Sequence, residues 1–317
     1  MVDLEARTSG LTAPIMLLTG HMADVSSVKF SPDGHSLASA SADKQIFLWE
    51  VFGDCTNYQV LKGHKNVVLE VLWSTDSTQL YSASADKTAG VWDALRGKRI
   101  RRLAEHSSYV SSISPARRTT TKCVSCSDDG TAKLWDLNER NSVLTLPHQY
   151  PVTSVTFDDS GDQVFTGGID NLIHCWDIRK PNSEIFRLLG HQETITCLRL
   201  DPFGSYVLSN GMDNELRIWD IRPFAPMQRC TKVFTGAQHN FEKTLLKCNW
   251  APDGSMIGSG SADRMVYIWD TTTRDIKYKL PGHAGTVNEV DFHPNQPIVA
   301  SCGSDSKIYL GEITKYN

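Results

Sequence analysis

Short apolar segments alternate with polar turns along most of the chain. In the first such stretch, residues 25–30 alternate with period two and end at a Ser-Pro-Asp-Gly turn. Residues 36–41, 45–51 and 58–61 are the strands expected next, and each is bounded by polar or glycine residues. Alternation and β-branched residues favour strands over helices. The pattern predicts a unit of four short antiparallel strands.

This unit recurs seven times, marked by four residue types at fixed offsets. Six tryptophans are spaced 43, 43, 41, 43 and 50 residues apart, and an aspartate lies six residues before each. A histidine lies about 28 residues before each tryptophan, and a hydroxyl residue lies four before each aspartate. The seventh unit has Gly311 in place of tryptophan. The members are His21, Ser39, Asp43 and Trp49; His64, Ser82, Asp86 and Trp92; His106, Ser125, Asp129 and Trp135; His148, Thr166, Asp170 and Trp176; His191, Ser209, Asp213 and Trp219; His239, Ser259, Asp263 and Trp269; and His283, Ser301 and Asp305.

A period of about 43 residues with four strands per unit is typical of β-propellers. The Gly-His to Trp-Asp framing resembles the WD40 family over residues 13–313, which implies an all-β, seven-bladed WD40 propeller. We assign residues 1–12 to a short polar N-terminal tail and residues 13–317 to one propeller domain. The last unit has only three strands, so residues 13–18 are expected to complete it and close the ring. Trp73 and Trp250 should be core residues, and Pro115 should weaken or bend the first strand of unit three.

Serine or threonine, histidine and aspartate therefore occur together in every unit, as in a serine hydrolase. Seven equivalent sets argue against catalysis, because an enzyme needs one positioned nucleophile and one oxyanion hole. The WD40 resemblance implies a structural network instead, in which aspartate contacts histidine, histidine contacts the hydroxyl, and the hydroxyl contacts the indole N–H. We expect no enzymatic activity. The network should be weakest in unit seven, which lacks the tryptophan.

Composition narrows the remaining classes of function. Eight cysteines are scattered through a chain with no secretory signal at its N-terminus, which favours reduced thiols. Cys123 and Cys126 form a single CxxC without the second pair that a structural zinc site needs, so we expect no metal and no cofactor. A net charge of −4 and a pI near 6.2 do not favour nucleic acid. No apolar run approaches the roughly 18 residues that cross a bilayer, so no membrane partner is expected.

The largest departure from the repeat lies between Trp219 and Trp269, which are seven residues further apart than usual. The additional residues fall in two loops that should emerge on opposite faces of the disc. We expect partner contacts at Arg222 and Phe224 in the first loop, and at Phe241 and Lys243 in the second. The alternative is that both phenylalanines fold back on their own blade.

A basic run offers a second candidate surface. It is either a patch for RNA, an acidic partner or nuclear import, or a solvated outer strand whose charges block edge pairing. No aromatic residues are interleaved with it, which argues against single-stranded RNA and favours the outer strand. Its members are Arg96, Lys98, Arg99, Arg101 and Arg102, followed by Arg117, Arg118 and Lys122.

Four stretches go beyond a generic propeller: residues 13–21, 51–58, 220–264 and 278–285. They resemble the WD40 proteins of the U5 small nuclear ribonucleoprotein (snRNP). The resemblance implies a nuclear, non-catalytic, monomeric propeller within the spliceosome that acts in pre-mRNA splicing. Its partners would be spliceosomal proteins, especially the large U5 scaffold protein, with any association with U5 RNA indirect.

The alternative is a WD40 substrate receptor of a cullin-RING ubiquitin ligase. Such receptors often carry a Trp-Asp-x-Arg ending, which occurs here at Trp176 to Arg179 and at Trp219 to Arg222. This interpretation predicts that Arg179 or Arg222 binds the ligase adaptor.

Overall fold

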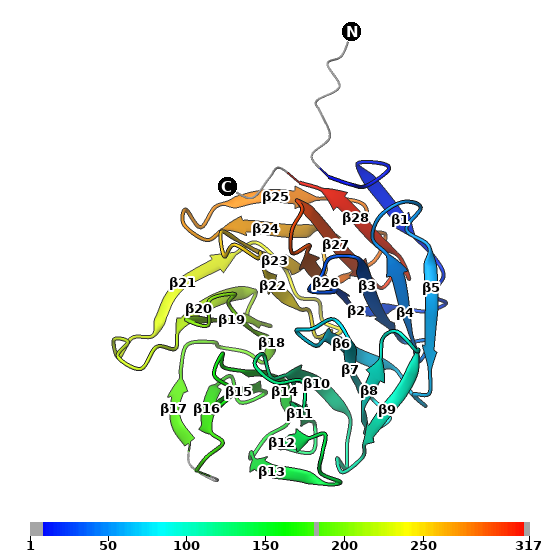
Figure 1. Cartoon of the computed structure of the whole chain (residues 1–317). Coiled ribbons are helices and arrows are strands. Elements are labelled where there is room, and N and C mark those ends of the chain that lie inside the picture. Colours follow the sequence, from blue (N-terminus) through cyan, green and yellow to red (C-terminus); the bar gives the residue numbers. More distant parts are fainter. Residues whose placement is uncertain (1–8, 181–183, 314–317) are drawn as a thin grey trace.

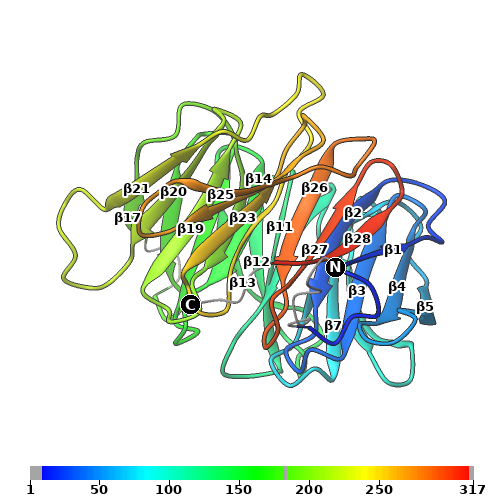
Figure 2. The ribbon, with the colours of Figure 1, turned by 90° about the horizontal axis from the view of Figure 1, so that it is seen from above.

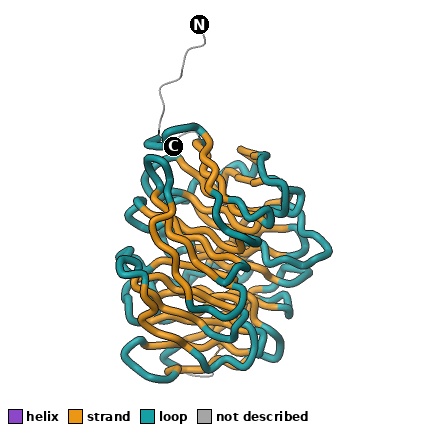
Figure 3. The backbone as a smooth tube through the Cα atoms, turned by 90° about the vertical axis from the view of Figure 1, so that its right-hand side faces the viewer, coloured by secondary structure: helices purple, strands orange, loops and turns teal. Residues whose placement is uncertain are grey.

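Seven four-stranded antiparallel sheets are arranged as blades around a central axis (Figure 1). The computed structural model describes residues 9–180 and 184–313. Seen from above, the sheets stand side by side as steeply inclined blades (Figure 2), and loops join the strands at both ends (Figure 3). Within the described ranges, no helix is long and apolar enough to cross a membrane. The predicted all-β, seven-bladed propeller is confirmed.

The first four blades each use four strands that are consecutive in sequence, ordered from the axis outward. Blade one comprises Val25–Phe30 (β2), Ser36–Ser41 (β3), Gln45–Glu50 (β4) and Asn57–Lys62 (β5). Blade two comprises Val68–Trp73 (β6), Gln79–Ser84 (β7), Ala89–Asp93 (β8) and Lys98–Leu103 (β9). Blade three comprises Val110–Pro115 (β10), Lys122–Ser127 (β11), Thr131–Asp136 (β12) and Ser142–Pro147 (β13). Blade four comprises Val152–Phe157 (β14), Gln163–Gly168 (β15), Ile173–Asp177 (β16) and Glu184–Leu188 (β17).

The remaining blades include the irregular sixth and the closing seventh. Blade five comprises Ile195–Leu200 (β18), Tyr206–Gly211 (β19), Glu215–Asp220 (β20) and Cys230–Thr235 (β21). Blade six comprises Cys248–Trp250 (β22), Met256–Gly260 (β23), Val266–Asp270 (β24) and Ile276–Leu280 (β25). Blade seven comprises Val287–Phe292 (β26), Ile298–Gly303 (β27), Ile308–Glu312 (β28) and, from the N-terminal region, Ile15–Leu18 (β1).

The ring is closed by β1, as predicted. It pairs antiparallel with β28, with Ile15 opposite Gly311 and Leu18 opposite Ile308. The residues just before β1 also pack on the ring, although they were expected to belong to a tail. Leu11 is only 3% exposed and bridges to Gly53 of blade one, because its apolar side chain is buried in the core between blades seven and one. Residues 1–8 of the predicted tail lie outside the described residues.

The first strands of the blades pack against one another around the axis. Trp73 donates its indole N–H to the carbonyl of Lys29 at 3.0 Å, and Trp250 donates to the carbonyl of Arg199 at 3.3 Å. Each of these bonds joins a blade to the one before it. Pro115 does not weaken β10, so that expectation is wrong. It is the last residue of the strand, and the next backbone hydrogen bond is donated by the amide of Ala116.

Buried charges from several blades meet at the axis. Arg199 of β18 contacts Glu70 of β6 at 2.5 Å and Glu289 of β26 at 3.3 Å. Lys29 of β2 lies 2.9 Å from Glu289 and 3.2 Å from Asp291. Each of these charges has a partner of opposite sign, as buried ions require. The axis is therefore occupied by paired side chains that join blades one, two, five and seven.

Candidate functional site

Four blades contain the complete network of four side chains. In blade one, Nδ1 of His21 lies 2.8 Å from Asp43, and its Nε2 lies 2.8 Å from Oγ of Ser39. The indole N–H of Trp49 donates to the same Oγ at 2.8 Å. The same bonds occur in blades two, three and five, among His64, Ser82, Asp86 and Trp92; His106, Ser125, Asp129 and Trp135; and His191, Ser209, Asp213 and Trp219.

The direction of these hydrogen bonds follows from the partners. A carboxylate only accepts, so Nδ1 carries the histidine proton and Nε2 accepts from the hydroxyl. Burial lowers the pKa of His21 and His106, although their aspartates partly offset it. Burial alone raises the pKa of a carboxyl, but hydrogen bonds from His64 and Thr88 outweigh it and hold the pKa of Asp86 below its usual range. The serine hydroxyls are fully buried, so a substrate in solvent cannot reach them.

Blade seven keeps three of the four members. His283 lies 3.0 Å from Asp305 and 3.0 Å from the hydroxyl of Ser301. Gly311 stands at the position of the indole, and Tyr309, two residues before it, packs edge-on against His283, with ring centroids 4.6 Å apart. The expectation that unit seven has the weakest network is wrong, because blade six has lost more of it.

Blade four keeps the hydroxyl contacts but redirects the aspartate. The hydroxyl of Thr166 lies 3.2 Å from Nε2 of His148 and accepts the indole N–H of Trp176 at 3.0 Å. Asp170, however, bonds to His174 at 2.6 Å, and His174 also bonds to Glu184 at 2.7 Å. The expected contact between Asp170 and His148 is not formed, because His174 competes for the aspartate from the position two residues before the tryptophan.

The change of partner for Asp170 alters the pKa values of the two histidines in blade four. Burial alone lowers the pKa of His174, but hydrogen bonds to Asp170 and Glu184 outweigh it and raise that pKa. Burial, together with the nearby charge on His174, lowers the pKa of His148 to about 4. The histidine of the repeat is therefore neutral at pH 7, whereas the two carboxylates favour the protonated form of its neighbour.

In blade six the expected network is absent. Asp263 accepts from the hydroxyl of Tyr267 at 2.7 Å, Trp269 donates to the carbonyl of Thr235 at 3.0 Å, and Ser259 donates to the carbonyl of Gly260 at 3.0 Å. Nε2 of His239 lies 3.4 Å from the side-chain oxygen of Asn210 instead.

Loop length explains the displacement in blade six. His239 precedes Asp263 by 24 positions, whereas the separation is 22 in blade one and 23 in blade three, where the network still forms. One additional residue is tolerated and two are not. Burial without an aspartate partner lowers the pKa of His239 to about 4.

The two loops of the insertion lie at opposite ends of β21. Residues 221–229 precede the strand and residues 236–247 follow it, and both project from the disc in Figure 2. Phe224 is 101% exposed and Phe241 is 93% exposed, so neither side chain folds back on its blade. Lys243 is also exposed and has a left-handed backbone, with φ of 54°. Exposed aromatics of this kind are enriched at protein interfaces.

The arginines of the two Trp-Asp-x-Arg endings are held by their own blades. The guanidinium of Arg222 forms a two-point contact with Asp220 and lies 5.5 Å from the ring centroid of Tyr206. Arg179 lies 3.3 Å from Asp177 and 3.2 Å from Asp162. Both guanidinium groups are paired within their own blades but remain more than half exposed, and each pairing stiffens the turn that it spans.

Much of the basic run is also engaged within the propeller. Arg99 stacks over Trp92 at 5.5 Å, and Arg101 donates to two carbonyls of blade three. Arg117 donates to the carbonyl of Leu200 at 3.0 Å, and Arg118 pairs with Asp159 at 2.7 Å. Since β9 is the outermost strand of its blade, these contacts fit the outer-strand interpretation.

Neither a metal centre nor a disulfide is assembled in the described part of the chain. Cys123 and Cys126 are both buried in β11, and no group of three or more potential metal ligands is found there. Burial raises the pKa of both thiols, which makes them poor ligands and poor nucleophiles.

The fold and its hydrogen-bond network define the class of the protein, a seven-bladed propeller of the WD40 type. The family model for the WD domain, G-beta repeat, matches seven segments: residues 12–50, 55–93, 97–136, 140–177, 182–220, 228–270 and 274–310. The chain belongs to the WD40 family and, within it, to the family of U5 snRNP 40 kDa proteins. It is 56% identical to the "U5 small nuclear ribonucleoprotein 40 kDa protein" of Homo sapiens and 55% identical to that of Dictyostelium discoideum, covering 97% of this chain and 86% of each relative. It is 43% identical to "Pre-mRNA-splicing factor cwf17" of Schizosaccharomyces pombe, covering 97% of this chain and 90% of that protein.

These relatives give no support to the ubiquitin-ligase alternative. The sequence analysis missed the paired charges at the axis. Their signal was present, since Glu70 and Arg199 are charges placed within otherwise apolar strands that the fold buries on both faces.

Proposed function

We propose that this chain is a non-catalytic docking platform of the U5 snRNP that acts in pre-mRNA splicing in the nucleus. The observation that carries the proposal is its 55–56% identity, over 97% of its length, to proteins named as U5 snRNP subunits. The 43% identity to a protein named as a pre-mRNA-splicing factor supports the same process. At this level of identity, the relatives and this chain share one fold.

The site geometry supports a role without catalysis. The hydroxyls that stand next to a histidine are buried, with Ser39, Ser82, Ser125 and Ser209 at 0% exposure. Each is hydrogen bonded to an imidazole and an indole, so its lone pair and proton are both engaged. The repeated side chains hold blades together, and the exposed loops are left to bind.

We further propose that the main partner is the large U5 scaffold protein, that contact with U5 RNA is indirect, and that the propeller is monomeric within the larger complex. The proposed contact residues are Phe224 and Arg222 before β21, and Phe241 and Lys243 after it. Two fully exposed phenylalanines in the one irregular segment support this placement, because aromatic anchors dominate binding energy at protein interfaces.

Affinity purification of the tagged chain from nuclear extract of its own source tests this function. Proteins and small RNAs are identified together, at low and at moderate salt. We expect U5 RNA and the large U5 scaffold protein to be recovered at both salt concentrations. Recovery of neither, or of a cullin adaptor in their place, would contradict the proposal.

A further inference from the structure

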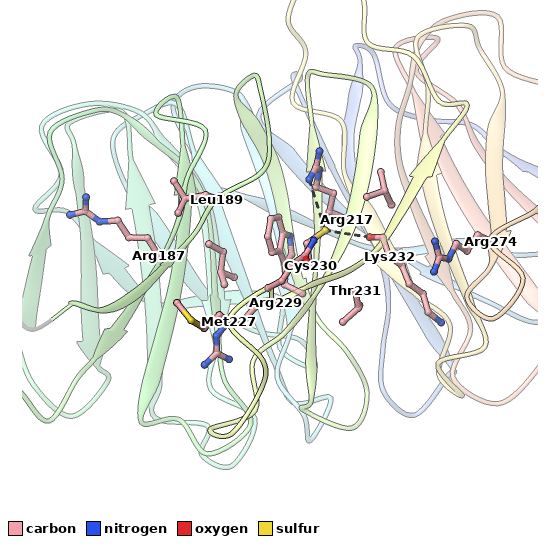
Figure 4. A pocket seen from close by; sticks show the side chains of 13 residues that line it. Arg187, Leu189, Arg217, Met227, Arg229, Cys230, Thr231, Lys232 and Arg274 are labelled. Atoms are coloured by element: carbon pink, nitrogen blue, oxygen red, sulfur yellow. Dashed lines mark hydrogen bonds between the residues drawn. The ribbon is translucent and has the colours of Figure 1, made fainter.

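Two neighbouring hollows, of about 340 Å³ and about 290 Å³, lie along the start of β21, between the outer parts of blades four, five and six. Thr231 and Lys232 line both of them. We call the pair the β21 groove. It lies beside the 221–229 loop, whose Met227 and Gln228 form part of its wall. Figure 4 shows the larger hollow, with Arg187 and Leu189 on one side and Arg274 on the other.

The smaller hollow is aromatic. Phe203, Tyr206 and Trp250 line it together with Ile218. Phe203 is 71% exposed although it is a large apolar side chain, and the indole N–H of Trp250 is already satisfied by the carbonyl of Arg199. Burying such surface is favourable by about 25 cal/mol per Å². This hollow is suited to one apolar side chain of a partner.

The larger hollow is cationic. Of its five basic residues, Arg187 pairs with Glu184 and Arg217 pairs with Glu215, both at 2.6 Å. The other three are Arg229, Lys232 and Arg274, and none of them forms an ion pair with a carboxylate among the described residues. Arg229 stacks 4.3 Å from the ring of Phe186, and Lys232 donates to the carbonyl of Thr271. Two of these positive charges, on Arg229 and Lys232, are thus held in place without a direct ion pair to a carboxylate.

The backbone beside the groove favours an extended occupant. β21 is the outermost strand of blade five, so its outer edge has no neighbouring strand. An extended segment adds to such an edge through main-chain hydrogen bonds, while its alternate side chains enter flanking hollows. Exposed apolar side chains lie beside the path, with Leu189 at 72% and Met227 at 103% exposure.

We propose that the β21 groove binds an extended acidic segment of a partner protein. One apolar side chain of the segment enters the hollow formed by Phe203, Tyr206 and Trp250, and its carboxylates pair with Arg229, Lys232 and Arg274. Single-stranded RNA fits less well, because the aromatic rings gather in the smaller hollow and are not interleaved with the charges of the larger one. The proposal rests on the proposed function only in placing the partner within the U5 particle.

Site-specific photo-crosslinking of the full chain in nuclear extract tests this proposal. The photoreactive amino acid p-benzoylphenylalanine replaces Thr231, and the matched control carries it in place of Val143. Both residues are the bulged residue at the start of an outermost strand, in β21 and β13 respectively. Cross-linked segments are identified by mass spectrometry. We expect the Thr231 position to capture a protein segment with net negative charge and an apolar residue, and the Val143 position not to capture that segment.

A charge reversal completes the test. Arg229→Glu combined with Arg274→Glu should lower the cross-link yield by roughly tenfold or more. Arg96→Glu with Arg102→Glu on blade two is the matched control and should leave the yield unchanged.

A cross-link to RNA, a cross-link to a neutral or basic segment, or no cross-link at all would overturn the proposal. If U5 components co-purify but the groove captures no acidic segment, the groove assignment fails and the function stands. If an acidic segment is captured without U5 components, the groove assignment stands and the proposed function fails.

Discussion

Blades five and six are neighbours that carry the same four marker residues, yet only blade five joins them. In blade five, Ser209 bonds to His191 at 2.6 Å and to Trp219 at 2.8 Å. In blade six, Ser259 bonds only to nearby backbone and to the side chain of Asn210. The difference is two additional residues between His239 and Asp263, together with Tyr267, which takes the aspartate; it is not the chemistry of the markers. A repeat pattern therefore states which side chains are available, and the loop between them decides whether they meet.

In blade four the marker residues are also present without forming the complete network, but for a different reason. Its spacing is regular, but His174 offers Asp170 a stronger partner than His148 does, since it is also held by Glu184. In blade six, Tyr267 occupies the corresponding position and takes Asp263. A histidine or tyrosine two residues before the tryptophan can thus take the aspartate, whereas Arg217 of blade five bonds to Glu215 and leaves Asp213 to His191. In blade seven Tyr309 does not compete, because its hydroxyl donates to the carbonyl of Gly282.

The largest expected effect is a loss of stability at acidic pH in the two blades whose repeat histidine lacks an aspartate partner. His148 and His239, the two repeat histidines without aspartate partners, have pKa values near 4 against an ordinary 6.5. The unfolded chain therefore takes up their protons first as the pH falls. Stability is fully present above pH 6.5 and is lost progressively down to about pH 4. Between pH 7 and pH 5 we expect a loss of about 2 kcal/mol for each of the two histidines.

Urea unfolding at the two pH values measures this loss. The double variant His148→Gln and His239→Gln serves as the comparison, since glutamine does not titrate. It should lose distinctly less stability on acidification than the parent chain. An equal loss in both proteins would show that the acid sensitivity lies elsewhere.

Removal of the hydroxyl of the network should destabilise the protein more in blade five than in blade six. Ser209→Ala leaves the indole N–H of Trp219 and Nε2 of His191 without their shared partner, so we expect a loss of about 2–3 kcal/mol. Ser259→Ala in blade six removes a donor to one backbone carbonyl and should cost less than about 1 kcal/mol. Urea unfolding of both variants at pH 7 gives the two values. Similar losses would mean that the network adds nothing to blade five beyond ordinary packing.

Removing the competitor should partly restore the network of blade four. His174→Phe takes away the charge beside His148 and frees Asp170, so the pKa of His148 should rise from about 4 by roughly one unit or more. Titration of the histidine ring signals by NMR measures this change. The ring of His21 in blade one, whose pKa is also lowered by burial, is the internal control and should not change. An unchanged pKa of His148 would show that burial alone sets it.

The loop aromatics should have the smallest effect on stability. Phe224→Ala and Phe241→Ala remove side chains that are almost fully exposed, so each should change the free energy of unfolding by less than about 0.5 kcal/mol. Thermal melting of the purified variants is sufficient to detect a larger change. A clear loss of stability would mean that these rings pack on the propeller in solution.

Much of the fold was predictable because the repeat supplies seven copies of each signal. The strands of the first unit were located within one residue, and the three-stranded last unit correctly indicated closure by the N-terminal strand. The sites were less predictable. The position of His239 depends on the path of a loop, and the partner of Asp170 depends on a competition that spacing does not reveal. Arg199, Glu70 and Glu289 are far apart in sequence and meet only because the ring brings blades five, two and seven to one axis.

The binding surface was predictable in part. The insertion between Trp219 and Trp269 indicated the irregular segment, and Phe224 and Phe241 were selected from it by residue type. The β21 groove was not foreseen, because Phe203, Tyr206 and Trp250 come from two blades and have no common spacing. Hollows between repeats depend on how side chains of adjacent units pack, which a single-unit pattern does not contain.

The most direct test of the docking account compares the tagged parent chain with the double variant Phe224→Ala and Phe241→Ala in nuclear extract. Recovery of U5 RNA and of the large U5 scaffold protein is quantified for equal amounts of folded protein. The account predicts that the parent recovers both and that the variant recovers at least roughly fivefold less, with an unchanged melting temperature. Equal recovery by the two proteins would contradict the loop assignment, and no recovery by the parent would contradict the proposed function itself.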